Sequence, residues 1–86
     1  MRAIWKFPLE VVGAQVVRMP LIAVVLCVQM QSGVPCLWAI CDTTSNEKAS
    51  RVFRIFGTGH EIGDYAADKY VGTFQTGGFV FHVFED

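Results

Sequence analysis

Length, composition and charge already exclude several classes of protein. The chain has 86 residues, of which 52% are hydrophobic and 17% charged, and its formal net charge is −1. A single domain spanning residues 1–86 is expected from this length. The near balance of basic and acidic residues argues against a generic nucleic-acid-binding protein, because such proteins gain affinity mainly from lysine and arginine on phosphates. A domain this small has little interior, so we also expect a homo-oligomer that buries part of its apolar surface.

The first two expected strands are short and end at prolines. Residues 3–9 alternate so that Trp5 and Phe7 share one face, and Pro8 ends the strand because proline has no N–H for a ladder. Gly13 marks a turn, and a second strand over residues 15–18 ends before Pro20. Both segments are therefore expected at sheet edges or strand ends.

The clearest strand pair joins residues 22–31 to residues 36–42 through Ser32 and Gly33. If these two residues form the loop, Gln31 faces Val34 and Cys27 faces Trp38. One face of the pair is then wholly apolar and is expected to be core: Val24, Leu26, Val28, Met30, Leu37, Ala39 and Cys41. The opposite face is also largely apolar, with Ala23, Val25, Cys27, Gln29, Cys36, Trp38 and Ile40. A sheet or subunit is expected to cover that second face, because half-solvated sheets alternate apolar with polar residues.

The remaining elements complete an all-β pattern. A polar loop over residues 43–50 precedes a strand over residues 51–56, and residues 62–68 are irregular with one helical turn capped by Asp64. The chain then shows a hairpin, with strands 70–75 and 79–84 around a glycine-rich break. Six or seven short strands predict a small antiparallel β-sandwich or barrel.

Two features indicate a soluble, cytosolic protein. The longest apolar run, residues 21–28, is far shorter than the roughly 20 residues that span a bilayer, and it starts too late for a secretory signal. The odd set Cys27, Cys36 and Cys41 shows no C-x-x-C spacing, which favours buried free thiols in a reducing compartment. Membrane association is not expected.

The glycine-containing segment that runs from Arg54 to His60 is the first candidate site. Gly57 and Gly59 follow a strand, so the backbone there is free to adopt positive φ and to aim N–H groups at an anion. Arg54 and His60 would add charge, and Thr58 a hydroxyl. The segment lacks the dinucleotide fingerprint and a P-loop lysine. A tight strand-ending turn, with Arg54 paired to a carboxylate or solvated, is the alternative interpretation.

Three further residues enter the candidate site. Trp5 and Trp38 are either core or interface anchors, or rings that stack on a planar ligand. His82 lies in an apolar run and is either a core histidine with one satisfied ring nitrogen or a ligand contact. The chain has no H-x-H pair, so no metal and no cofactor are expected. Nothing pairs a nucleophile with a base, so an enzyme is not expected.

Five segments resemble a family of short, uncharacterised proteins encoded by phages and prophages: residues 4–10, 34–39, 53–60, 70–75 and 81–85. They follow the family's order nearly end to end, although Leu21 and Ile22 replace its polar, glycine-containing turn. The resemblance implies a genomic setting and no particular activity, since the family is a domain of unknown function.

This setting favours a non-enzymatic accessory protein in the host cytoplasm that counters antiviral defence by binding. The version that we favour over the others sequesters a small anionic, nucleotide-type signal at Arg54, Gly57, Thr58, Gly59 and His60, with Trp38, Trp5 or His82 as further contacts. A second version inhibits a host defence protein through the apolar second face. A third makes the protein an assembly component of the virion.

Overall fold

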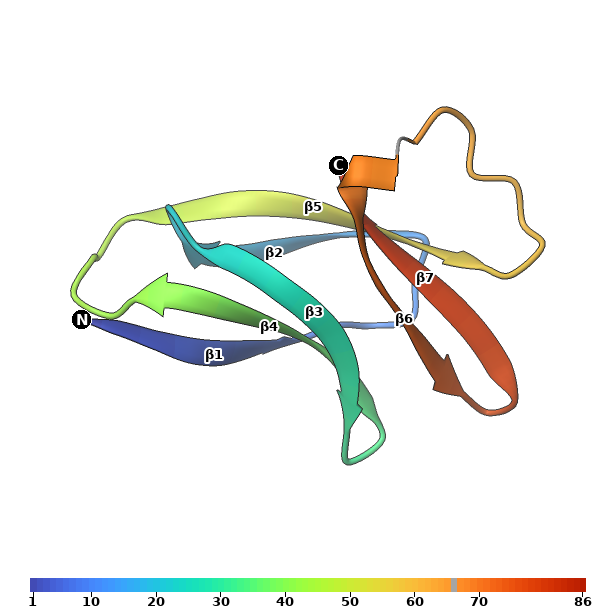
Figure 1. Cartoon of the computed structure of the whole chain (residues 1–86), viewed down its shortest axis with the longest axis horizontal. Helices are drawn as coiled ribbons and strands as arrows, with labels where there is room; N and C mark the ends of the chain where they lie inside the picture. The colour runs from blue at the N-terminus through green and yellow to red at the C-terminus, as the bar shows by residue number, and fades with distance from the viewer. Residues whose placement is uncertain (66) are drawn as a thin grey trace.

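In the computed structural model, which describes residues 1–65 and 67–86, the chain forms seven strands and one short 3₁₀ turn (Figure 1). The strands are β1 (Arg2–Pro8), β2 (Ala14–Pro20), β3 (Val24–Gln31), β4 (Val34–Asp42), β5 (Lys48–Gly57), β6 (Tyr70–Thr76) and β7 (Phe79–Glu85). The 3₁₀ turn η1 covers Ala67–Lys69. The predicted all-β class and strand number are confirmed.

The strands form two antiparallel sheets rather than a closed barrel. The three-stranded sheet has the order β1-β4-β3, and the four-stranded sheet has the order β2-β5-β7-β6. In Figure 1, β1 lies along the lower margin of the molecule, and β3 runs diagonally across the middle, between β4 and the β6–β7 hairpin. The arrangement is an open sandwich, so each sheet keeps one face turned away from the other.

Two tight turns set the hairpin registers. Ser32 and Gly33 have φ values of 50° and 81°, and Gly77 and Gly78 have 58° and 81°. Positive φ at both central residues is the requirement of a type I′ turn, whose twist matches the flanking strands. Gln31 consequently pairs with Val34 and Cys27 with Trp38, which confirms the predicted register.

The register changes at a bulge that the sequence analysis did not anticipate. Leu26 is the extra residue between Val25 and Cys27, so Val25 pairs with Ala39 and Val24 with Ile40. The prediction that Val24 and Leu26 belong to the core is therefore wrong, because their side chains are 54% and 46% exposed. Val25, which was assigned to the second face, instead packs against the core.

The core lies between the two sheets. Its buried members come from both sheets and the loops beside them: Leu9, Met19, Ala23, Val28, Leu37, Ala39, Cys41, Phe53, Ile55, Phe74 and Val83. All three cysteines are free thiols, as their odd number predicted. Cys36 and Cys41 are buried as expected, whereas Cys27 is half-buried. Burial raises the pKa of the Cys41 thiol, which favours its uncharged form.

Arg51 connects the four-stranded sheet to the segment just before β3. Its Nε and Nη2 donate to the two carboxylate oxygens of Glu85 at 2.6 and 2.7 Å, and its Nη1 donates to the carbonyl of Ala23 at 2.6 Å. The ion pair is half-buried and raises the pKa of Arg51. This forked geometry is the strong form of an arginine–carboxylate pair.

The helical turn is shorter and later than expected. Residues 62–68 were assigned one helical turn capped by Asp64, whereas η1 begins at Ala67. Residue 66 of that segment lies outside the described residues, so the prediction there stands untested.

β3 and β6 approach each other closely where the two sheets meet. A Cβ on Gly72 would lie 2.8 Å from Cγ1 of Val28 and 3.4 Å from its backbone N. A Cβ at position 72 would therefore require Val28 to move, because its Cγ1 atom lies closer than van der Waals contact allows. A second bulge, between Tyr70 and Gly72 in β6, lies beside the contact. Both β3 and β6 therefore carry a bulge near the point where they contact each other.

Replacing Gly72 with alanine is expected to lower the free energy of unfolding by about 1–3 kcal/mol, because the added methyl group overlaps Val28. Urea denaturation measures the change. Gly13→Ala is the matched control, since nothing lies within 4 Å of a Cβ at that position and its φ is not in the left-handed range. Equal stability of the two variants would contradict the close approach.

Candidate functional site

The outer face of the three-stranded sheet carries an uncovered row of aliphatic side chains. Ile4 pairs with Ile40, and Ile40 pairs with Val24, so the three residues lie in line across β1, β4 and β3. Ile4 is 60% exposed, and Ile22, just before β3, is 71% exposed. We call the set Ile4, Ile22, Val24, Leu26 and Ile40 the aliphatic row. Exposed apolar patches of this kind mark interaction surfaces on small soluble proteins.

A polar contact and an indole flank the aliphatic row. Lys6 on β1 hydrogen bonds Gln31 on β3, and the bond therefore spans β4. Trp38 pairs with both Lys6 and Cys27 and is half-buried on the same face. Its Nε1 is buried and has no acceptor among the described residues. An unsatisfied buried donor costs about 1–3 kcal/mol.

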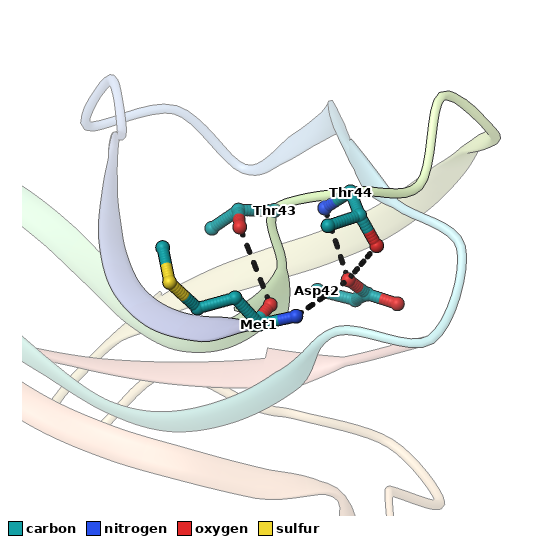
Figure 2. Close-up of polar contacts among 4 residues, drawn as sticks. All are labelled: Met1, Asp42, Thr43 and Thr44. Atoms are coloured by element: carbon teal, nitrogen blue, oxygen red, sulfur yellow. Dashed lines mark hydrogen bonds and ion pairs between the residues drawn. The ribbon is translucent and has the colours of Figure 1, made fainter.

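The other end of the row is a polar corner (Figure 2). One carboxylate oxygen of Asp42 accepts from the backbone N–H and the hydroxyl of Thr44, at 3.0 and 2.7 Å, and lies 3.8 Å from the amino group of Met1. These bonds hold the pKa of Asp42 below its usual range. Thr43 donates to the carbonyl of Met1, which fastens the start of β1 to the end of β4.

A hollow of about 330 Å³ opens beside this corner. Its apolar lining includes three members of the aliphatic row, Ile22, Val24 and Ile40, and its charged lining includes Arg2 and Asp42. An apolar side chain with a polar neighbour would fit such a lining. The hollow makes this corner the best-shaped part of the uncovered face.

The glycine-containing turn has fewer free donors than an anion site needs. The Thr58 N–H donates to the carbonyl of Val80 at 3.1 Å, and the His60 N–H donates to that of Gly57 at 3.1 Å. Gly59 has a φ of 88°, as predicted, but Gly57 does not have positive φ. The His60 ring packs on Gly57, because a Cβ there would lie 2.9 Å from the ring and would displace it.

His82 is the centre of a chain of hydrogen bonds on the outer face of the four-stranded sheet. Its Nε2 lies 2.6 Å from the Thr58 hydroxyl and its Nδ1 lies 3.0 Å from that of Thr73, which in turn bonds the Tyr70 hydroxyl. Thr58 also donates to the Val80 carbonyl at 3.3 Å. His82 was expected to be either a core histidine with one satisfied ring nitrogen or a ligand contact. The core placement is wrong, because His82 is half-buried on the outer face and both of its ring nitrogens are satisfied.

The Thr58 hydroxyl has a single proton, which it donates either to the Val80 carbonyl or to Nε2 of His82. In the first arrangement Nε2–H of His82 donates to Thr58, and Nδ1 accepts from Thr73. In the second arrangement the imidazole accepts the Thr58 proton, and Nδ1–H donates to Thr73. The pairing of Thr58 with His82 brings a hydroxyl and a potential base together, which the residue types alone did not predict.

Arg54 is paired with a carboxylate, which is one of the alternatives expected for it. Its Nε and Nη2 both lie 3.3 Å from one carboxylate oxygen of Asp86, and the pair is exposed. Tyr65 donates to the other Asp86 oxygen at 2.9 Å. The Tyr65 bond and the Arg54 charge hold the pKa of Asp86 below its usual range. Tyr65 itself packs on Phe84 in an aromatic cluster.

The structure divides the predicted site residues between the two sheets. Thr58 and His82 are in contact, and Gly57, Thr58 and His60 line a hollow of about 370 Å³. Trp5 and Trp38, expected to stack on the same ligand, belong to β1 and β4 of the other sheet, and Trp5 lies under Lys48 at 5.8 Å. The aromatic side chains that do line the hollow are Phe79 and Phe81, which the sequence analysis placed only in the final hairpin.

Comparison with known families gives a match over the whole chain. The family model described as Domain of unknown function (DUF7352) matches residues 1–86. The chain belongs to the DUF7352 family. This agrees with the expected resemblance to a family of unknown function. No curated protein and no solved structure shows significant similarity to this DUF7352 chain.

No group of three histidine, cysteine or acidic side chains lies close enough together to hold a metal ion in the part of the chain that the structure describes. Within residues 1–65 and 67–86, no helix has the length and apolar character to cross a membrane.

Replacing Trp38 with phenylalanine is expected to leave the melting temperature unchanged or to raise it, because the change removes a buried donor without an acceptor and keeps most of the apolar ring. Trp38→Ala, which also removes the ring, is expected to cost about 3 kcal/mol. Thermal unfolding followed by circular dichroism measures both. A Trp38→Phe variant as unstable as Trp38→Ala would show that the indole N–H has a partner.

Proposed function

We propose that this protein is a non-enzymatic accessory protein of a phage or prophage and counters host defence by binding a host protein. The observation that supports the proposal is the aliphatic row with its adjoining hollow on the three-stranded sheet. Burial of such a face against a complementary apolar surface stabilises the complex by roughly 25 cal/mol for each Å² of apolar surface removed from water. The phage setting comes from the family resemblance and remains part of the proposal.

The electrostatics favour this version over capture of an anionic signal. The one arginine assigned to the anion site is paired with Asp86, and two N–H groups of the glycine-containing turn are bonded to carbonyls. An anion site needs free donors or free positive charge. The aliphatic row, in contrast, is exposed and has a shaped hollow beside it.

Replacing Val24 with aspartate is expected to abolish function, because it places a charge between Ile22 and Leu26 and next to Ile40 in the aliphatic row. The measurement is the plating efficiency of a defence-sensitive phage on a host that carries an active defence system and expresses the protein. The wild-type protein is expected to raise plating, and Val24→Asp to return it to the level of the empty host.

Val16→Asp is the matched control. Val16 is also an exposed strand valine, 62% accessible, but it lies on the outer face of the four-stranded sheet. It is expected to act like the wild-type protein. Equal activity of Val24→Asp and wild type would refute the proposed docking face. Sedimentation of the same variants tests the expected homo-oligomer, which remains a prediction and would be lost in Val24→Asp if another copy covers the row.

A second candidate function is retention of a small planar ligand at the glycine-containing turn. The hollow there is lined by Gly57, Thr58 and His60 together with Phe79, whose ring is 68% exposed. Exposed aromatic rings stack on nucleobases, so these residues could hold a nucleotide-type signal without either tryptophan.

Calorimetric titration with cyclic and linear nucleotides tests this candidate. Phe79→Ala is expected to weaken binding by about tenfold, since base stacking contributes about 1–3 kcal/mol, and Arg54→Ala is expected to change it little. Tyr70→Ala, on the neighbouring strand but outside the lining, is the control. Absence of heat with every nucleotide would remove this candidate.

A further inference from the structure

β1 has an open backbone edge. The Leu9 N–H donates to the Pro35 carbonyl, and the Met1 carbonyl accepts from the Thr43 N–H. In an antiparallel pair the residues that bond the partner alternate, so the odd residues of β1 bond β4. The N–H and C=O groups of Arg2, Ile4 and Lys6 therefore point away from β4. β1 is the terminal strand of its sheet, and its outer side forms the margin of the molecule in Figure 1.

The same three residues carry their side chains on the outer face of the sheet. Ile4 belongs to the aliphatic row, and Arg2 and Lys6 lie two residues to either side of it. A strand added beside β1 would thus hydrogen bond Arg2, Ile4 and Lys6 and place its own side chains directly next to theirs. It would also lengthen the aliphatic row by one residue opposite Ile4.

The charge on this edge is positive. Asp42, the residue opposite Arg2 in the ladder, has one oxygen engaged by Thr44, and among the described residues no carboxylate lies within ion-pair distance of Arg2 or Lys6. Lys6 is held only by the neutral Gln31. The edge therefore presents the order cation, aliphatic residue, cation, each two residues apart.

This order disfavours a second copy of the chain as the added strand. Antiparallel pairing of two β1 strands about Ile4 would set Arg2 of each copy directly opposite Lys6 of the other. Like charges opposite each other destabilise strand pairs. A strand with the complementary order, acidic, apolar, acidic, would gain both charge pairs and the contact with Ile4.

We infer that the open edge of β1 is a strand-addition site for an extended acidic–x–apolar–x–acidic segment of a partner protein. The inference deepens the proposed protein-binding function, because it names the chemistry of the segment that docks beside the aliphatic row. β2 is also a terminal strand with an open edge, but its outer-face residues Ala14, Val16 and Arg18 offer one cation instead of two. The remaining terminal strands, β3 and β6, are bulged and close to each other.

The test uses a fluorescein-labelled heptapeptide, Thr-Glu-Thr-Val-Thr-Glu-Thr, and its counterpart with both Glu replaced by Lys. Fluorescence anisotropy with the full-length protein is expected to give a dissociation constant about tenfold lower for the acidic peptide, because two cross-strand charge pairs change sign. The double variant Arg2→Glu, Lys6→Glu is expected to reverse this preference. Equal affinity for the two peptides, or an unchanged preference in the double variant, would overturn the inference.

Ile4→Pro tests the backbone contact. The substitution removes the Ile4 N–H, which points to the open edge, and leaves every N–H that bonds β4 in place. The fold is therefore expected to be retained, while the affinity for the acidic peptide falls at least fivefold. Val16→Pro is the matched control, because the bonds from Leu21 to Glu47 and from Ile55 to Gly13 show that the Val16 N–H points to the open edge of β2. Equal affinity of Ile4→Pro and Val16→Pro for the acidic peptide would overturn the inference. If Ile4→Pro fails to fold, the peptide preference of the Arg2→Glu, Lys6→Glu variant tests the inference instead.

The outcomes separate this inference from the proposed function. If Val24→Asp loses anti-defence activity while Arg2→Glu, Lys6→Glu keeps it, the aliphatic row is supported as the binding surface and the strand-addition site is wrong. If neither variant changes activity, the proposed function itself is wrong.

Discussion

The close passage of β3 over β6 is the constraint on which the arrangement of the two sheets depends. Gly72 leaves room for Val28 to lie against the β6 backbone, and each of the two strands carries a bulge near the contact. Bulges bend strands and increase local twist. The bend allows one edge of each sheet to meet the other while the opposite edges, β1 and β2, stay open. A side chain at position 72 would overlap Val28 at the point where the two sheets meet.

The bulge at Leu26 has a second effect on the surface. It turns Val25 toward the core and leaves Val24 on the outer face, directly in line with Ile40 and Ile4. Without the extra residue, the strand would keep its strict alternation and bury Val24. The uncovered aliphatic row is therefore built by the same irregularity that lets the sandwich bend. Fold and candidate interaction surface share one cause.

Much of the fold followed from local signals in the sequence. The two-residue loop of Ser32 and Gly33 predicted the register of β3 and β4, and Pro8 and Pro20 marked strand ends correctly. The bulge at Leu26 leaves no local signal, because Val24, Val25 and Leu26 are all apolar and fit either face. The assignment of two residues to the core failed for that reason.

The site was less predictable because it depends on contacts between distant segments. Residue types alone showed neither that Arg51 would reach Glu85 and Ala23, nor that Arg54 would meet Asp86. The two tryptophans were grouped with the glycine-containing turn on chemistry, whereas sheet order places them apart. Position along a strand predicted its faces except beyond the bulge in β3, whereas only the order of the strands decides which faces adjoin.

The carboxylate of Asp86 has a consequence for how the molecule responds to acid. One of its oxygens accepts from Tyr65 and the other lies beside Arg54, and these two partners hold the pKa of Asp86 below its usual range. A carboxylate with a lowered pKa in the folded state stabilises the fold at neutral pH, and this contribution is lost as the pH falls through the lowered pKa. Acidification is therefore expected to release the segment around Tyr65 from its contact with Asp86.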